Sequence, residues 1–171
     1  MVGSVPMMYK NNCGGANAPP YVSKGDEIKR MSKFTYTALQ TIPGGGNALL
    51  ADADRRCGKC RSAGLTDTGV IRLLGASSQP CARYGVRFGA NVAIPAGGTA
   101  GPITIALVVD GVVLPSSIAI VTPAAAGDFW HIAIDDTVDV PYHSSSQIAV
   151  RNNGTDDIEM QNAILIVNRE A

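Results

Sequence analysis

Short apolar runs separated by turn-forming residues fill the chain from Phe34 onward. A turn signal recurs every eight to fifteen residues, which is typical of a β-sandwich or barrel. No segment keeps the apolar period of about 3.6 residues that marks an amphipathic helix. The predicted strands are residues 34–42, 47–54, 68–75, 82–94, 102–110, 112–121, 129–140, 146–152 and 157–168. The pattern therefore predicts an all-β antiparallel sandwich with very little helix.

Two of these strands are apolar on both faces. In residues 103–109 and 163–167 both alternating sets of side chains are largely apolar, which is typical of strands covered on both sides. A two-layer sandwich covers only one face of each strand. The second face therefore indicates contact with copies of the chain or with a larger assembly, unless small residues such as Thr104 and Ala106 simply face solvent singly.

Two dipeptides are predicted to form tight turns. Asp110-Gly111 lies between two apolar runs and is a strong signal for a type I′ hairpin, which needs positive φ at both central positions. Asn153-Gly154 is a second candidate of the same kind. Its match to a glycosylation acceptor carries no weight beside the turn, because no secretory leader is evident at the start of the sequence.

The first 32 residues differ in character from the rest of the chain. They contain Gly14-Gly15, Pro19-Pro20 and several asparagines, with no apolar period that could form a self-burying strand or helix. Ordering such a segment costs about 1–2 kcal/mol per residue, so we expect it to dock on a neighbouring subunit or on another protein. The alternative is that it wraps its own domain. The candidate anchors are Met7, Met8, Tyr9, Tyr21 and Val22.

Composition narrows the range of partners. The 171 residues suit one domain, in which 46% are hydrophobic and only 16% are charged. The 14 basic and 14 acidic side chains cancel, which disfavours nucleic acid and membrane surfaces as partners. With neither a leader nor a long apolar segment in view, we expect synthesis in a cytoplasm.

Four cysteines provide one candidate metal or redox motif. Cys57-Gly-Lys-Cys60 has the C-x-x-C spacing, but a zinc site needs four ligands, and only Cys13 and Cys81 remain. We interpret the motif as a turn with two free thiols; a metal site or a disulfide is the alternative.

A second polar cluster comprises His131, His143, Asp128, Asp135, Asp136 and Asp139. Closely spaced carboxylates can ligate calcium, but a calcium loop also needs a turn glycine and six or more oxygens. Alternation places His131, Ala133 and Asp135 on one strand face, which favours a solvated outer face over a metal site. We predict no metal and no cofactor.

The remaining polar and glycine-rich features do not match a phosphate-binding or catalytic motif. Gly44-Gly45-Gly46 lacks the Lys-Ser/Thr ending of a phosphate-binding loop, and no Gly-x-Ser-x-Gly elbow is present. Arg83 and Arg87 share a strand face, where they are expected to form ion pairs at a subunit boundary or to be solvated. None of these features forms a catalytic constellation, so the sequence predicts a protein that is not an enzyme.

The second half of the chain resembles a known family. The segments that carry the likeness are CARYGVRFGANVAIP (81–95), GPITIALVVDG (101–111), PSS (115–117), IVTPA (120–124), VDVP (138–141) and QNAILIV (161–167). In this order they resemble the C-terminal domain of collagen-like exosporium glycoproteins, which is similar to the globular heads of tumour-necrosis-factor and complement proteins. Related modules occur in phage virion proteins.

The resemblance implies a jelly roll of about ten strands that forms a homotrimer. We expect residues 1–32 to be an attachment arm and residues 33–171 the trimeric domain. The apolar second faces place Ile103, Ile105, Leu107, Ile164 and Ile166 at the trimer interface.

The chain has no Gly-X-Y stalk before the head, which favours a virion location over a spore surface. The expected function is a phage head decoration protein that the arm binds to the major capsid protein or another virion scaffold protein, on the head surface. The alternative is a receptor- or glycan-binding head whose loops 95–101 and 141–146 contact ligand.

Overall fold

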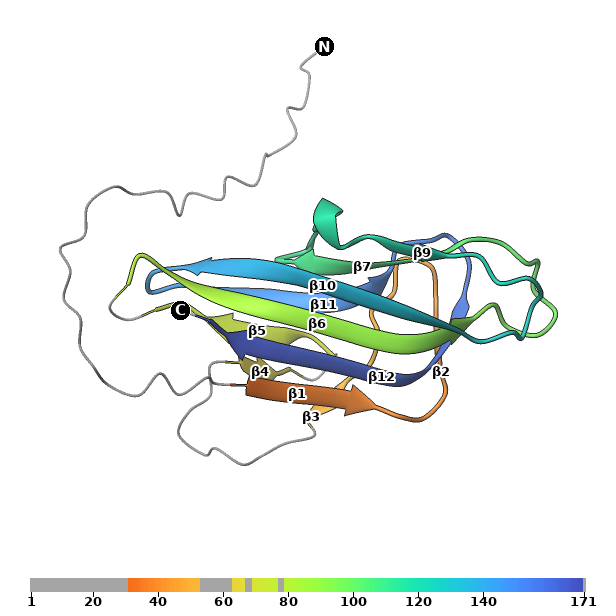
Figure 1. Ribbon diagram of the computed structural model, residues 1–171, viewed down its shortest axis with the longest axis horizontal. Helices are drawn as coiled ribbons and strands as arrows, with labels where there is room; N and C mark the ends of the chain where they lie inside the picture. The colour runs from red at the N-terminus through yellow and green to blue at the C-terminus, as the bar shows by residue number, and fades with distance from the viewer. Residues whose placement is uncertain (1–30, 53–62, 67–68, 77–78, 171) are drawn as a thin grey trace, which may run out of the picture.

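Two antiparallel β-sheets pack face to face in the computed structural model, which describes residues 31–52, 63–66, 69–76 and 79–170 (Figure 1). Sheet A contains β1 (Met31–Tyr36), β2 (Gln40–Ile42), β3 (Ala51–Asp52), β6 (Cys81–Ala93), β10 (Trp130–Pro141) and β12 (Ile158–Arg169). Sheet B contains β4 (Ala63–Leu65), β5 (Ile71–Leu74), β7 (Ile103–Val109), β8 (Val112–Val113), β9 (Ala119–Val121) and β11 (Ser145–Asn152). The only helical element of the described part is the 3₁₀ turn η1 (Pro115–Ser117).

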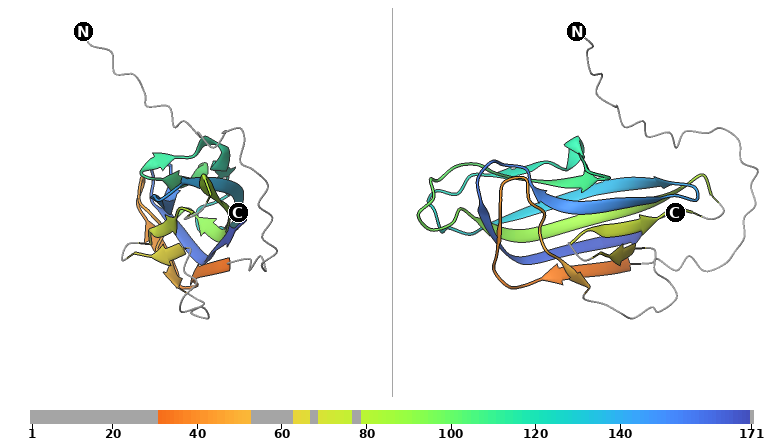
Figure 2. Two further views of the ribbon diagram at one scale, coloured as in Figure 1. Left: turned by 90° about the vertical axis from the view of Figure 1, so that its left-hand side faces the viewer. Right: turned by 180° about the vertical axis from the view of Figure 1, so that it is seen from behind.

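The chain crosses repeatedly from one sheet to the other. Sheet A runs β10-β6-β12-β1-β3, with β2 also paired to β12, and sheet B runs β4-β5-β11-β7-β8, with β9 also paired to β7. Consecutive long strands such as β10, β11 and β12 therefore alternate between layers, and the view along the sandwich in Figure 2 shows the two layers. An all-β antiparallel jelly-roll sandwich was predicted, and the structure confirms it.

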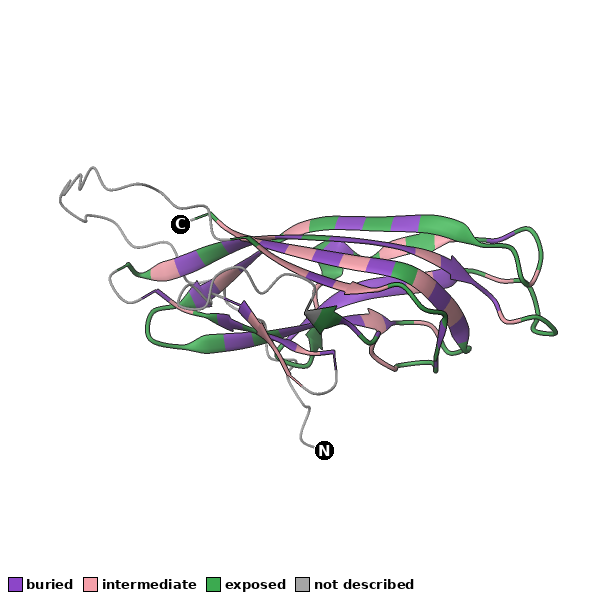
Figure 3. Ribbon diagram, turned by 90° about the horizontal axis from the view of Figure 1, so that it is seen from below, coloured by how far each residue is buried: buried purple, intermediate pink, exposed green. Residues whose placement is uncertain are grey.

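Alternation along each strand builds the core. In β6 the side chains of Tyr84, Val86 and Phe88 are at most 3% exposed, while Arg83 and Arg87, at alternate positions, face out. The same alternation is visible as bands along the long strands in Figure 3. Phe34, Leu165 and the inward residues of sheet B complete a single apolar cluster. Because side chains alternate with a period of two, each strand covers the core with one face and leaves the other available.

Two predicted strands are interrupted in the structure. Residues 34–42 divide into β1 and β2, which pair with consecutive parts of β12 on either side of a bulge between Gln161 and Ile164. Residues 112–121 divide into β8 and β9, because Pro115 begins the 3₁₀ turn η1 between them. The short strand β4 was not predicted, since Ala63–Leu65 is too brief to show an alternating pattern.

One of the two predicted hairpin turns is confirmed and the other is wrong. Asp110 and Gly111 have φ of 51° and 85°, as a type I′ turn between β7 and β8 requires. Asn153-Gly154 instead connects β11 in sheet B to β12 in sheet A, two strands that do not pair. The connection is fixed because Gly154 N–H donates to Asn152 Oδ1 (3.0 Å) and Asn153 N–H donates to the Thr104 carbonyl (2.8 Å).

The described chain begins at the first strand. β1 starts at Met31, so the last two residues of the predicted arm belong to the sandwich. The proposed arm anchors, Met7, Met8, Tyr9, Tyr21 and Val22, lie outside the described residues, as do Cys13, Cys57 and Cys60. No helix in the described ranges is long and apolar enough to cross a membrane.

Candidate self-association surface

The outer face of sheet A carries an apolar strip at its centre. Ile164 and Ile166 on β12 point away from the core and are half-buried, whereas the alternating residues Leu165 and Val167 are at most 1% exposed. In register, Ile164 lies between Gly89 of β6 and Thr35 of β1. Ile166 lies one row further along the same face. Apolar side chains in the middle of an outward sheet face are the kind of surface that subunit contacts cover.

Short side chains keep this face flat beside the strip. Gly89 lies between Ile164 on one side and Ala133 of β10 on the other. A Cβ at Gly89 would lie 3.4 Å from His131 Cε1 and 3.7 Å from Ile164 Cγ2. The first distance is at the limit of a tight contact, and the second is an ordinary van der Waals contact. The backbone of Gly89 does not have positive φ, so the fold of the single chain does not demand a glycine there. The His131 ring and Ile164 fill the space over Gly89, which is buried in the single chain, so the surface at this point is formed by those two side chains.

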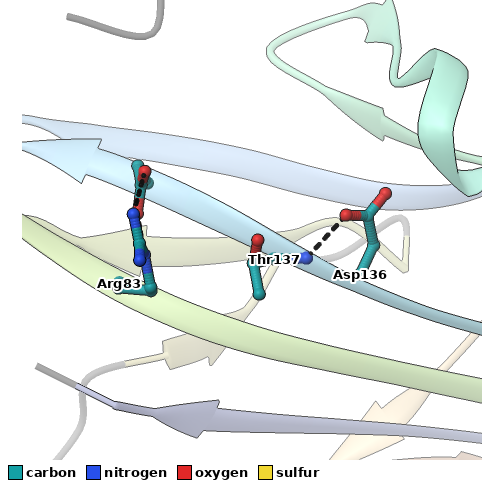
Figure 4. A network of polar contacts seen from close by, with 4 residues as sticks. Arg83, Asp136 and Thr137 are labelled. Atoms are coloured by element: carbon teal, nitrogen blue, oxygen red, sulfur yellow. Dashed lines mark hydrogen bonds and ion pairs between the residues drawn. The ribbon is translucent and has the colours of Figure 1, made fainter. Parts of the chain in front are cut away.

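Cross-strand ion pairs neutralise the remainder of the face between β6 and β10. Arg83 donates to both carboxylate oxygens of Asp139, at 2.9 and 3.1 Å, and Arg87 Nε donates to Asp135 Oδ2 at 3.1 Å (Figure 4 draws the first pair). The hydrogen bond and charge of Asp139 raise the pKa of Arg83 above its ordinary value. These arginines were expected to form ion pairs at a subunit boundary or to be solvated; in the single chain each pairs with an aspartate, and their side chains are also 53% and 67% exposed to solvent. The paired charges of β6 and β10 add no net charge to this part of the face, while Lys33 of β1 lies beside Ile166 on the same face.

The predicted interface residues divide between two locations. Ile103, Ile105 and Leu107 on β7 are 0–1% exposed and belong to the core of the single chain, so they offer no surface to a partner. The prediction for these three is corrected: when both alternating sets of a strand are apolar, the sequence does not distinguish inward from outward. Ile164 and Ile166 alone lie on an outer face.

An exposed apolar edge adjoins this surface and was not predicted. Ile118 is 43% exposed and Ile120 on β9 is 65% exposed; β9 lies beside β10, whose first residue Trp130 is 47% exposed. Phe129, immediately before β10, is 40% exposed. The alternation of Ile118 and Ile120 after a proline was the sequence signal available, but it does not say which side of an edge strand is free. Figure 1 shows β9 and β10 along the same flank of the sandwich.

Asp136 occupies a backbone donor in the middle of β10, which is the edge strand of sheet A. Its Oδ1 accepts a hydrogen bond from Thr137 N–H at 2.7 Å (Figure 4), and its Oδ2 accepts one from Ser116 Oγ at 2.6 Å. Ser116 belongs to η1 at the edge of sheet B, so the carboxylate also ties the two sheets together. A charged side chain that occupies an edge donor is a known protection against unwanted strand addition.

The other predicted chemical features are dispersed. His131 Nδ1 lies 3.3 Å from Asn91 Oδ1 on the outer face of sheet A, and His143 lies at the β10–β11 turn with Tyr142, their ring centroids 3.9 Å apart. Among the described residues, no three His, Cys, Asp or Glu side chains come together as a metal site. Cys81 is a free thiol. Gly44–Gly46 form a turn in which Gly46 N–H donates to the Pro43 carbonyl.

The two loops predicted to contact a ligand lie far apart. Residues 95–101 follow β6, and residues 141–146 follow β10, which runs antiparallel to β6 over its full length. The two loops therefore lie at opposite ends of the sandwich and do not form one site.

Comparison with known proteins shows a likeness of fold. No protein-family model and no curated protein matches the sequence. Among solved structures, the chain is similar to the Eiger TNF of S. frugiperda, with a TM-score of 0.64, 11% identity, and coverage of 84% of this chain and 93% of that one. The globular domain of the zebrafish complement 1qA protein also matches, with a TM-score of 0.41, 11% identity and coverage of 81% and 94%. The fold is a jelly-roll head of the kind seen in the tumour-necrosis-factor protein.

Proposed function

We propose that the chain is a non-enzymatic structural head that self-associates through the outer face of sheet A. The observation that supports this most directly is the outward position of Ile164 and Ile166 on a face where Arg83 and Arg87 of β6 are paired with aspartates of β10. Burial of apolar area stabilises an interface by about 25 cal/mol per Å². Because this face lies beside the exposed edge at Ile118, Ile120 and Trp130, we propose that the edge of one subunit packs on sheet A of the next, as a homotrimer.

We further propose that the head decorates a phage capsid. In this reading the segment before β1 is the attachment arm, the major capsid protein or another virion scaffold protein is its partner, and the trimer lies on the outside of the virion head. The resemblance of residues 81–167 to phage virion modules and the jelly-roll fold support the proposal. Its contribution to the shell is mechanical and requires no cofactor.

Solution mass tests the self-association. Light scattering on the purified full chain is expected to give three times the chain mass of 17.7 kDa. The double variant Ile164→Asp/Ile166→Asp is expected to give a folded monomer, because both carboxylates would lose their hydration in the interface, and cations, Arg87 and Lys33, flank only position 166. The matched control Leu74→Asp changes an apolar residue that is 41% exposed on β5 of sheet B, and it is expected to stay trimeric. A monomeric unmodified chain contradicts the proposal.

Binding to undecorated shells tests the finer proposal. The full chain is expected to sediment with purified shells that lack decoration protein. Deletion of residues 1–30 leaves β1 intact and is expected to keep the trimer but abolish co-sedimentation. Co-sedimentation of the truncated chain would show that the arm is not the anchor, and a trimer that ignores shells even with the arm would exclude decoration.

A receptor- or glycan-binding head is the second candidate. The observation that favours it is the half-exposed ring of Tyr142 at the β10–β11 turn, 48% exposed and packed edge-on against His143. Aromatic faces of this kind stack on apolar ligand surfaces. Glycan-array binding that Tyr142→Ala abolishes, together with failure to bind shells, would favour this function over decoration.

A further inference from the structure

The second apolar face of β7 is not explained by association through sheet A. Ala106 and Val108 point away from the core cluster, yet they are 0% and 3% exposed, and Ala149 opposite Val108 on β11 is 4% exposed. All three lie on the outer face of sheet B, which is the opposite side of the sandwich from Ile164 and Ile166. Association through sheet A therefore does not account for the burial of these three residues on sheet B.

A small hollow of about 150 Å³ lies on that face at a change of strand partner. β5 pairs with the first half of β11, up to Ile148, and the segment around Asn47 pairs with the second half, where Ala48 N–H donates to the Val150 carbonyl at 2.8 Å. Between these two partners, next to Ala149, the hollow opens. Its apolar lining comes from Val70, Val108 and Ala149.

An arginine borders the hollow and is held in place. Arg151 is half-buried, two positions from Ala149 on the same face of β11, and its Nε donates to Asn47 Oδ1 at 3.2 Å. Within the described ranges Arg151 forms no ion pair with a carboxylate. The amide hydrogen bond fixes the plane of the guanidinium without neutralising its charge. A partly buried cation of this kind gains from an anion placed against its remaining donors.

The residues around the hollow indicate which kind of anion would fit beside Arg151. Gln147 lies on the other side of Ala149 and lines the hollow, and Arg72 lies opposite Gln147 in the register with β5. Asp110, next to the lining residue Gly111, accepts a hydrogen bond from Gln147 N–H at 2.7 Å. An apolar floor beside a single fixed guanidinium suits a carboxylate on a short hydrocarbon stem, whereas a phosphate would leave the apolar floor uncovered.

We propose that this hollow binds the side chain of a glutamate presented by a protein partner, with its methylene groups on Val70, Val108 and Ala149 and its carboxylate on Arg151. The volume is comparable to that of one side chain, and Val108 and Ala149, which are 3% and 4% exposed, offer only a small contact area at its floor, which fits insertion of one residue from a larger surface rather than enclosure of a free molecule. The site does not depend on association through sheet A.

Methyl NMR of the full chain with two blocked tripeptides tests the site. The probes are Ac-Val-Glu-Val-NH₂ and its matched control Ac-Val-Gln-Val-NH₂. The acidic peptide is expected to shift the methyl signals of Val70, Val108 and Ala149 and to bind about ten-fold more tightly than the neutral one, because the charge-assisted hydrogen bonds are lost with glutamine.

Three variants identify the groups responsible. Arg151→Gln is expected to reduce the affinity for the acidic peptide to that of the neutral one, and Ala149→Met is expected to block both by filling the hollow. Arg83→Gln, a paired arginine on sheet A, is the control and should bind as the unmodified chain does. Equal binding of the two peptides, or an acidic peptide that is unaffected by Arg151→Gln, would overturn the carboxylate assignment. Absence of methyl shifts with either peptide would overturn the site itself.

Discussion

Single glycines fix the loops that join the strands. Gly69 has φ of +71°, and a Cβ there would lie 2.3 Å from the Ala48 carbonyl oxygen. Gly111 has φ of +85°, but nothing lies within 4 Å of a Cβ at that position. The first glycine is therefore needed both for backbone conformation and for space, while the second is needed for conformation only.

These two glycines predict different costs of substitution. Gly111→Ala is expected to destabilise the chain by about 1–2 kcal/mol, the cost of a left-handed conformation for a residue with a Cβ. Gly69→Ala is expected to cost more, because the backbone that carries Ala48 must also move. Urea unfolding followed by circular dichroism measures both. Gly64→Ala is the control: its φ is not positive and nothing lies within 4 Å, so its unfolding midpoint should change little.

At the scale of the element, alternation predicted most of the strands but not their partners. The residues of β6 and β10 were located closely from period-two patterns, and those of β7 from a continuous apolar run. The inward face of β7 was undecidable because both of its sides are apolar, which is why Ile103, Ile105 and Leu107 were misplaced. The assignment of each strand to sheet A or sheet B depends on long-range pairing that no local pattern carries, so Asn153-Gly154 looked like a hairpin.

The β10 edge yields a prediction about aggregation. Asp136→Ala removes the acceptor that occupies Thr137 N–H and the hydrogen bond to Ser116, so a long strand edge becomes available for pairing with other chains. The variant is expected to form aggregates faster than the unmodified chain in a heated light-scattering assay. Asp135→Ala on the same strand is the matched control, because it breaks only the exposed pair with Arg87. Equal aggregation of the two variants would show that charge loss, and not the edge hydrogen bond, is responsible.

At the scale of the whole molecule, the single tryptophan reports on assembly. Trp130 is the chain's one tryptophan and is 47% exposed in the single chain, at the edge proposed to meet sheet A of a neighbour. Its fluorescence emission is expected to shift to shorter wavelength as protein concentration rises, because the indole leaves water on association. The Ile164→Asp/Ile166→Asp variant should keep the long-wavelength emission at all concentrations. A shift in that variant would place the tryptophan in a contact that does not involve sheet A.

The register of β1 against β12 determines how the head bears tension. Met31 lies opposite Asn168, so the beginning and the end of the sandwich are side by side at one end of an antiparallel pair. A force that separates these two positions breaks the hydrogen bonds between β1 and β12 one pair after another. A force carried through the sheet faces instead loads many bonds together. A domain built in this way withstands tension best when it is held by its sheet faces and tethered by one terminus only.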